Sequence, residues 1–571
     1  MFPPATRKEL RALGWDALDI ILVTGDSWID SPHIGAAVIA NVLLDKGWRV
    51  GVIPQPDISG DSDITRLGEP ELFWGVTAGC MDSMVANYTA AGKRRKNDDL
   101  TAGGQNTRRP DRAVIAYTNL IRRYFKQTKP VVLGGMEASL RRISHYDWWS
   151  DKVRRSVLFD AKADLLVYGM AEKTLPELAR HLKSGKDITG LRGICYISKT
   201  RPEGFTELPS HEDAAADKTA FTRMFHTFYK NLDPLKGRGI CQLQDTRYLV
   251  CNPGQPPLTS KELDRVHELD FKRMPHPVHD PEGEVRAMDT IRFSIPSHRG
   301  CYGECHFCAI TAHQGKTVIS RSRESIIREA KVLTGHPGFR GVITDVGGPT
   351  ANMYEIECEK KFTKGACRNK RCLGEKVCKE LPVSHEPQIR LLRELKNIAG
   401  VRHVFVGSGI RHDLVLADKD HGRAYLGEII ASHVSGQLKI APEHSSDKIL
   451  SLMGKPGAET ARKFISLFRQ TAEKLNPRCH LTCYFIAAYP GSTMEDMKEV
   501  RRFAKKELGF IPEQIQVFTP APSTAAALMY YTEHSFPEQR PLYVEKNPFR
   551  RQKQKDIVQG KISGRKSKGK T

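Results

Sequence analysis

Residues 300–310 read GCYGECHFCAI and place three cysteines in one short segment. Cys301, Cys305 and Cys308 follow the run IRFSIP, whose apolar residues indicate a β-strand, so the three thiols share the loop after that strand. Three thiolates this close together can face one cubane cluster and leave its fourth iron without a protein ligand. The spacing therefore predicts a [4Fe-4S] cluster with one iron open to chemistry.

A zinc ion is the alternative occupant of this loop. Structural zinc sites normally use four ligands, often in paired CxxC knuckles. The segment offers three cysteines, so a nearby histidine would have to complete the set, and the candidates are His298, His306 and His313. The iron–sulfur cluster is the interpretation that needs no further protein ligand.

At these residues the chain resembles the radical S-adenosylmethionine (SAM) superfamily, whose CxxxCxΦC pattern is met by the three cysteines and by aromatic Phe307. The resemblance implies that SAM binds the open iron and that an electron from the cluster cleaves its sulfonium. The resulting 5′-deoxyadenosyl radical would abstract a hydrogen from the substrate. An electron donor such as flavodoxin or ferredoxin is the partner that this chemistry implies.

Alternating strand and helix patterns return over residues 289–530. Repeated βα units of this length predict a partial or full (β/α) barrel, the radical SAM barrel of the resemblance, with its active site on the loops that follow the strands. In that superfamily a Gly-Gly-Glu motif after the second strand binds the SAM amine. Here Gly347 and Gly348 match the glycines, and Pro349 replaces the glutamate. The resemblance therefore implies cofactor binding through the glycine backbone.

Two later strand ends supply further candidates for binding SAM. Ser408 and Arg411, in SGIR, could bind its ribose or carboxylate, and the alternative is a turn with a solvated arginine. Glu443 and His444, in LKIAPEH, end a strand that resembles the one facing SAM in methylthiotransferases. Either residue could bind ribose or act as a catalytic acid or base, and the alternative is a capping or surface pair.

A second cysteine group lies in the insertion 355–380, directly after the Gly-Gly-Pro strand. Its members are Cys358, Cys367, Cys372 and Cys378. Four thiols in a short loop suit a structural zinc tetrahedron or an auxiliary iron–sulfur cluster, although the group lacks a CxxC pair. Reduced thiols without a metal are the remaining interpretation. The many neighbouring lysines and arginines could also bind phosphate.

Residues 1–200 show an earlier series of strands and helices, which predicts an α/β domain with a doubly wound parallel sheet. This segment resembles the cobalamin-binding-type domain that precedes many radical SAM cores. In the cobalamin signature the ligand histidine has Asp two places before it and Gly three after. His33 stands three after Asp30 and two before Gly35, so the binding of cobalamin stays open. Residues 201–288 are expected to form a connector.

The chain of 571 residues carries a formal net charge of +22. Such an excess attracts polyanions, so nucleic acid is a possible partner. The tail 531–571 is basic and is expected to be disordered. No stretch is long and apolar enough for a membrane span or a secretory signal, which predicts a cytoplasmic protein without a membrane partner.

The order of these parts resembles the YgiQ family of radical SAM proteins over nearly the whole chain. Two hypotheses about function follow. In the first, the chain is a radical SAM enzyme whose substrate is RNA or another anionic molecule. In the second, it is a metal-stabilised nucleic-acid-binding protein with structural cysteine sites and no SAM chemistry.

Overall fold

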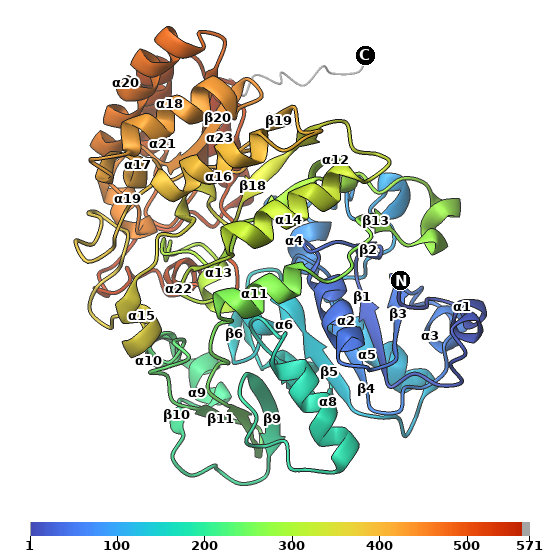
Figure 1. The fold of residues 1–571 in the computed structure, drawn as a ribbon. Coiled ribbons are helices and arrows are strands. Elements are labelled where there is room, and N and C mark those ends of the chain that lie inside the picture. The colour runs from blue at the N-terminus through green and yellow to red at the C-terminus, as the bar shows by residue number, and fades with distance from the viewer. Residues whose placement is uncertain (1, 562–571) are drawn as a thin grey trace, which may run out of the picture.

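The computed structural model describes residues 2–561. Figure 1 shows a first α/β domain, blue to green, packed against a second α/β unit, yellow to red. Among the described residues, no helix is long and apolar enough to cross a membrane.

A nine-stranded sheet forms the centre of the first domain, in the order β10-β11-β12-β9-β8-β5-β4-β1-β3. The five parallel strands are β3 (Val50–Pro54), β1 (Ile20–Thr24), β4 (Phe73–Thr77), β5 (Val131–Gly134) and β8 (Leu165–Val167). The next strand in chain order, β9 (Ile194–Ser198), runs antiparallel to β8. The parallel part has the strand order of a flavodoxin-like doubly wound fold, whose ligand crevice lies at the carboxyl ends of the strands.

Helices cover both faces of this sheet. Within β1, Ile21 and Val23 join a core with α5 (Ala113–Tyr124), whereas Ile20 and Leu22 join a second core with α2 (Gly35–Asp45) and α8 (Thr174–Ser184). Neighbouring residues of a strand face opposite sides, and every residue of β1 is buried. The continuous apolar run IILVT is thus the sequence of a strand covered on both faces.

The predicted connector 201–288 is wrong in its first part, because that part completes the sheet of the first domain. The strands β10 (Thr206–Leu208), β11 (Ile240–Gln244) and β12 (Arg247–Cys251) extend the sheet beyond β9. Helix α10 (Lys218–Lys230) buries three phenylalanines in the core of the first domain. The strands β11 and β12 form a hairpin whose register places Gln244 opposite Arg247. The first domain therefore reaches past residue 250.

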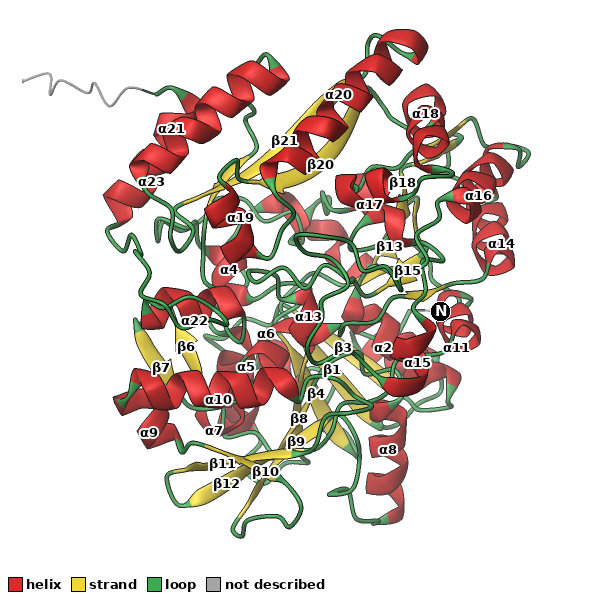
Figure 2. Ribbon diagram, turned by 90° about the vertical axis from the view of Figure 1, so that its left-hand side faces the viewer, coloured by secondary structure: helices red, strands yellow, loops and turns green. Residues whose placement is uncertain are grey.

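The second unit is a partial barrel of successive parallel pairs. Its strands are β14 (Ser294–Pro296), β17 (Val342–Ile343) with β18 (Asp345–Gly347), β19 (His403–Val404), β20 (Gln437–Glu443), β21 (His480–Ala487) and β22 (Ile515–Val517). The helices between them are α14 (Arg323–Thr334), α16 (Glu386–Lys396), α17 (His412–Ala417) with α18 (Gly422–Ser432), α20 (Ala458–Leu475) and α21 (Met494–Phe503). Within residues 2–561, β22 does not pair with β14, so the barrel is open. Figure 2 shows β20 and β21 beneath α20.

The C-terminal segment is ordered as far as it is described, contrary to the expectation for residues 531–571. Helix α22 (Ala525–Thr532) lies in the same hydrophobic core as the first sheet, and α23 (Pro548–Gln559) packs on α21. The Trp148 indole donates to the Tyr530 hydroxyl at 3.3 Å, and Arg551 stacks over the Trp148 ring at 4.9 Å. These contacts hold the two units together. Residues 562–571 of the predicted tail lie outside the described residues.

Candidate functional site

Two of the three cysteines of the cluster loop, residues 300–310, lie against one glycine, Gly303. A Cβ atom at Gly303 would lie 3.3 Å from the Cys301 sulfur and 3.4 Å from the Cys305 sulfur. The Gly303 N–H donates to the Cys301 sulfur at 3.3 Å. Burial raises the pKa of the Cys308 thiol to about 12, and the nearby thiols of Cys305 and Cys301 add to the rise. The thiols therefore share one water-poor place.

This donor set is compatible with a cubane cluster. Within residues 2–561, no group of three or more His, Cys, Asp or Glu side chains is arranged to hold one metal ion. A cubane presents its irons at separate corners, so its thiolate ligands stand further apart than the ligands of one ion. Cys301, Cys305 and Cys308 meet the requirement of three thiols facing one place from a single loop.

Arg411 points its charge at this loop. It lies just before α17, and its guanidinium forms a paired contact with Asp413 and directs Nη1 to the Cys305 sulfur at 3.7 Å. The side chain is buried, so the alternative of a solvated turn is wrong. A fixed cation beside a cysteine ligand stabilises its thiolate form. The structure places Arg411 at the cysteines, and its predicted contact with SAM stays a prediction.

Glu443 lies on the same side as the cysteines. It ends β20 with φ +73°, a conformation that is strained for a residue with a side chain. Burial raises the pKa of its carboxyl group, and the nearby cations Lys455 and Arg411 oppose the rise. Its charge also contributes to the raised pKa of Cys308. The backbone strain thus places a buried carboxyl group close to the cluster loop.

The neighbouring His444 faces a different part of the molecule. Its Nδ1 accepts the Ser446 N–H at 3.0 Å, and its Nε2 is buried with no hydrogen-bond partner in the part of the chain that the structure describes. Burial lowers the pKa of His444 to about 4, and the charged group that opposes this is Asp496 in α21. The structure therefore separates the two residues that the sequence paired, and it brings only Glu443 to the cysteines.

The glycine pair after β18 makes close backbone contacts. A Cβ atom at Gly348 would lie 2.6 Å from Nε2 and 2.8 Å from the carbonyl oxygen of His298. A Cβ atom at Gly347 would lie 3.3 Å from the Cα atom of Ala351. Only glycine fits at position 348 without a shift of its neighbours. The side of this backbone that faces His298 and Ala351 is therefore tightly packed. The side that faces the cavity carries no side chain and can approach a ligand.

Ser408 lies next to this edge and is held by Asp345. The Asp345 carboxylate accepts the hydroxyl of Ser408 and the N–H groups of Gly407 and Ser408, the last two at 2.7 and 3.1 Å. The hydroxyl hydrogen of Ser408 is thus already used, and its oxygen is left to accept a hydrogen bond from a ligand. Sequence reasoning identified Ser408 but did not identify Asp345 as the group that orients it.

A cavity of about 500 Å³ separates the glycine edge of the barrel from the carboxyl edge of the first sheet. From the sheet it is lined by Gly79, Gly135 and Gly169, and from the barrel by Gly348, Pro349 and Ser408. Ile310, two residues after Cys308, also lines it. The cluster loop, the glycine edge and the crevice of the first sheet thus meet at one cavity of the size that ligand sites have.

Three polar side chains in the cavity wall have buried atoms that find no hydrogen-bond partner among residues 2–561. These atoms are both ring nitrogens of His267, Nε2 of His298 and Oε2 of Glu172. The other carboxylate oxygen of Glu172 accepts from Arg299. Burial lowers the pKa of His298 to about 4, so its imidazole is neutral at pH 7.

His33 lines the same cavity, just before α2. Its Nε2 lies 3.2 Å from the carbonyl oxygen of Ser294 in β14. Because a carbonyl oxygen only accepts, this ring nitrogen carries a proton and donates. His33 therefore links the two units through Nε2, and the hydrogen bond to Ser294 engages that nitrogen.

The insertion packs on the cluster loop. Cys358 and Cys372 lie in one apolar layer with Tyr302, and the Cys358 N–H contacts the Tyr302 hydroxyl at 3.2 Å. Burial raises the pKa of the Cys372 thiol to about 11. Cys367 and Cys378 are partly buried. Because the sulfurs do not form a ready single-ion site within residues 2–561, metal binding by this group stays a prediction.

Arg371 is one of the basic residues of the insertion, and no sequence pattern distinguishes it from the others. Its Nη2 donates to the carbonyl oxygens of Gly303 at 2.7 Å, Glu304 at 2.6 Å and Gly454 at 3.1 Å. Three carbonyls from two segments thus share one guanidinium group. The insertion fixes the backbone of the cluster loop through this side chain.

Glu304 is the other residue that the sequence did not single out. It lies between Cys301 and Cys305 with φ +43°, and its buried carboxylate accepts from Tyr229 at 3.1 Å and pairs with Lys316 at 3.0 Å. An acidic residue within the cysteine motif was the available signal. The pairing ties the cluster loop to α10 of the first domain.

Two family models match the chain. A model described as Radical SAM N-terminal matches residues 2–294, and a model described as Radical SAM superfamily matches residues 295–504. Their boundary coincides with the first strand of the barrel.

Curated relatives match over the full length. UPF0313 protein FN0734 of Fusobacterium nucleatum is 50% identical over 566 residues, which are 99% of this chain and 100% of the relative. A UPF0313 protein of Thermotoga maritima is 49% identical over 570 residues, with the same coverage of 99% and 100%.

A solved structure shares the fold. It is the radical SAM methyltransferase TsrM from Kitasatospora setae, described with cobalamin and a [4Fe-4S] cluster bound. The TM-score is 0.50 at 15% identity, and the match covers 94% of this chain and 85% of TsrM. The arrangement of the two units is therefore one that occurs in a radical SAM enzyme.

Proposed function

The chain belongs to the UPF0313 (YgiQ) family of radical SAM enzymes, and from this premise we propose that it reductively cleaves SAM at a [4Fe-4S] cluster held by Cys301, Cys305 and Cys308. The alternative of a nucleic-acid-binding protein without SAM chemistry is set aside, because both family models describe radical SAM proteins.

The observation that carries the proposal is that three partly buried thiols share one loop, and that the same loop reaches the wall of the cavity through Ile310. Cys301 and Cys305 flank Gly303, and Ile310 of the same loop lines the cavity. Cys301, Cys305 and Cys308 would hold the cluster, which would supply the one electron needed to cleave the C5′–S bond of SAM into methionine and a 5′-deoxyadenosyl radical.

The residues of the chain would position SAM and exclude water. The backbone at Gly348 is suited to the methionine end of SAM, because it lines the cavity without a side chain in between, whereas the Gly347 carbonyl oxygen already accepts the Ser297 N–H at 2.7 Å. Ser408 offers an acceptor oxygen. Arg411 would stabilise the thiolate of Cys305 by its charge. A reductant of the flavodoxin or ferredoxin type would deliver the electron.

We further propose an anionic substrate, with RNA as one member of that class. The support is the formal net charge of +22, which attracts polyanions at long range. A comparison of cellular RNA and metabolites after incubation with wild type and with Cys305→Ala tests this proposal. A mass change that only the wild type produces identifies the substrate.

A corrinoid bound to the first domain is a second proposal, which rests on the cavity. The crevice side of the first sheet opens into the cavity through Gly79, Gly135 and Gly169, and TsrM is described with cobalamin bound. Because Nε2 of His33 is engaged with Ser294, this nitrogen would not serve as a lower ligand. A corrinoid absorption spectrum after supplementation supports the proposal, and a spectrum without it contradicts the proposal.

The test of SAM cleavage is anaerobic incubation of the reconstituted protein with dithionite and SAM. We expect 5′-deoxyadenosine and methionine in equal amounts. Protein that binds only colourless zinc and leaves SAM intact would contradict the proposed function.

A further inference from the structure

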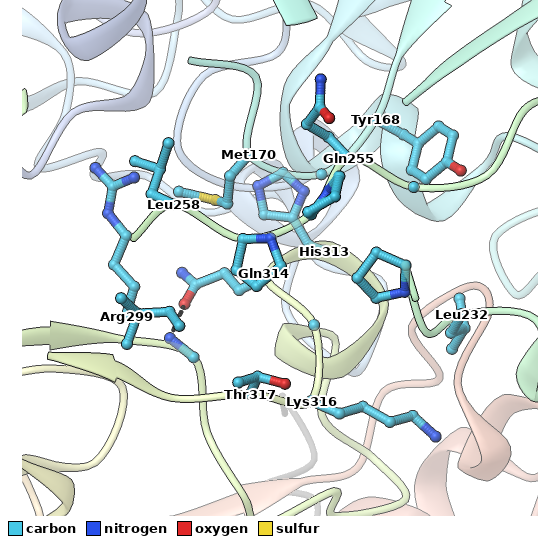
Figure 3. Close-up of a pocket in the computed structure, with 18 of the residues that line it drawn as sticks. Tyr168, Met170, Leu232, Gln255, Leu258, Arg299, His313, Gln314, Lys316 and Thr317 are labelled. Carbon is cyan, nitrogen blue, oxygen red and sulfur yellow. Dashed lines mark hydrogen bonds between the residues drawn. The ribbon is translucent and has the colours of Figure 1, made fainter. Parts of the chain in front are cut away.

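A smaller pocket adjoins the cavity and has a volume of about 90 Å³. Figure 3 shows that its walls come from both units, with Tyr168 and Met170 from the first domain and His313, Gln314 and Thr317 from the segment after the cluster loop. Met170, His313 and Gln314 also line the larger cavity, so the two spaces are neighbours. The volume is well below the ~300 Å³ of a small-molecule pocket and suits one functional group of a ligand.

Four basic side chains line this pocket: Arg142, Lys173, Arg299 and Lys316. Three of them have a carboxylate partner. Lys173 pairs with Glu262 at 2.8 Å, Lys316 pairs with Glu304 at 3.0 Å, and Arg299 pairs with Glu172. Within residues 2–561, Arg142 forms no ion pair. The basic residues of the pocket and their partners therefore leave one positive charge without a counter-ion.

Arg142 is buried, and part of its guanidinium is already engaged. It stacks between the rings of Tyr168 at 4.4 Å and Phe228 at 4.6 Å. Its Nη1 donates to the carbonyl oxygens of Ser139 and Ala312. These contacts hold the guanidinium in one orientation and stabilise it only in part, because a buried charge remains without an anion.

The remaining N–H groups of Arg142 have no acceptor in the described part of the chain. The hydrogen bonds of its guanidinium to residues 2–561 both come from Nη1, and Nε and Nη2 are not among the fully enclosed atoms that lack a partner. Since Arg142 lines the pocket, these N–H groups are accessible from it. A planar guanidinium with free N–H groups on one edge binds carboxylate or phosphate oxygens in pairs.

We propose that this pocket is a subsite for an anionic group of the substrate, a carboxylate or a phosphate, bound by Arg142. The proposal rests on the proposed function, since the neighbouring cavity would hold SAM and the reacting part of the same substrate. The subsite fixes the anionic end beyond His313 and Gln314, so that the rest of the molecule extends into the cavity beside the cluster loop.

The experiment titrates full-length, cluster-reconstituted protein with inorganic phosphate and, separately, with acetate, in an anaerobic calorimeter at constant ionic strength set with chloride. We expect saturable binding of at least one probe at one site per chain. The tighter probe identifies the class of the anionic group. Arg142→Met should weaken that binding about tenfold or more, because charge-assisted hydrogen bonds are lost.

Two further variants make the result specific. Arg142→Lys keeps the charge but loses the planar fork, so we expect an intermediate loss of affinity, which remains measurable if Arg142→Met does not fold. Lys93→Met removes an exposed basic residue outside the pocket and should leave binding unchanged. Absence of saturable binding of both probes, or equal affinities of wild type and both Arg142 variants, would overturn the proposal. Anion binding is measured without SAM, so its failure is distinct from a failure of SAM cleavage.

Discussion

The cluster loop and the insertion 355–380 both concentrate cysteines, yet the structure uses them differently. In the cluster loop, Cys301 and Cys305 converge on Gly303 beside the cation of Arg411. In the insertion, Cys358 and Cys372 lie in an apolar layer with Tyr302, and Arg371 donates to the backbone of the cluster loop. Cysteine density alone therefore does not define a reactive centre. The first region gathers its thiols in a loop that reaches the cavity through Ile310, and the second supports the first.

The largest expected effect separates the two regions by substitution of a cysteine in each. Cys301→Ala should abolish the [4Fe-4S] absorbance, because a cubane needs all three thiolates of the loop. Cys372→Ala should retain that absorbance, since Cys372 packs beneath Tyr302. The measurement is the visible spectrum with iron and zinc content after anaerobic reconstitution. Equal loss of the cluster in both variants would contradict the different roles of the two regions. Loss of zinc alone in Cys372→Ala would establish the second metal site.

Arg371 tests whether the insertion holds the cluster loop. Arg371→Ala removes donation to three carbonyl oxygens, and we expect a loss of about 3 kcal/mol in the free energy of unfolding. The cluster should also be lost faster to a chelator, because the loop backbone becomes free to move. The matched control is Arg368→Ala, an exposed arginine of the same insertion. Identical unfolding and chelation curves for both variants would show that Arg371 has no such role.

His444, which the structure separates from its neighbour Glu443, should make the stability of the protein depend on pH. The unfolded chain takes up a proton at His444 near its ordinary pKa of 6.5, whereas burial holds the folded pKa at about 4. A folded pKa below the unfolded one gives stability that is complete above pH 6.5 and is lost as the pH falls towards 4. We expect His444 to account for about 2 kcal/mol of the loss between pH 7 and pH 5.

The measurement is the difference in unfolding free energy between these two pH values for wild type and His444→Gln. The variant should lose less stability on acidification. His403→Gln, at an exposed histidine of the same barrel, is the control and should follow the wild type. A His444→Gln variant that follows the wild type as well would contradict the account of a neutral, buried His444.

The smallest expected effect concerns the glycine edge. Gly348→Ala would place a Cβ atom 2.6 Å from His298 Nε2 and force a backbone shift next to the cavity. Overpacking of this kind costs about 1–3 kcal/mol, so SAM should bind about tenfold more weakly. In the insertion, Gly374→Ala meets nothing within 4 Å and should bind SAM as the wild type does. Equal SAM affinities in a titration of the two variants would remove Gly348 from the site.

The sequence predicted the cluster loop and the two α/β units because their signals are local. Cysteine spacing and the alternation of apolar strands with amphipathic helices need no knowledge of distant contacts. The hairpin β11–β12 was missed because its strands, ICQLQ and RYLVC, mix polar and apolar residues between long turn-rich stretches. Its membership in the first sheet is decided by pairing with β9, far away in the sequence.

Long-range contacts also explain the other differences. Helix α23 has few apolar residues, and what orders it is the burial of Arg551 against Trp148 and of Val558 in the barrel core. The role of Arg371 depends on carbonyl groups more than sixty residues away along the chain. His444 was paired with Glu443 because they are adjacent, but a strained residue directs the two side chains to different neighbours. Such contacts are set by tertiary packing, which spacing does not encode.

The most direct test of the central claim is the amount of 5′-deoxyadenosine that anaerobic wild type and Cys305→Ala release from SAM with dithionite as the electron source. Cys305 belongs to the thiol triad and receives the contact from Arg411, so its removal takes away a cluster ligand while leaving the cavity in place. We expect 5′-deoxyadenosine with the wild type and none above the protein-free background with the variant. Equal release by both proteins, or no release by an iron-loaded wild type, would contradict the claim.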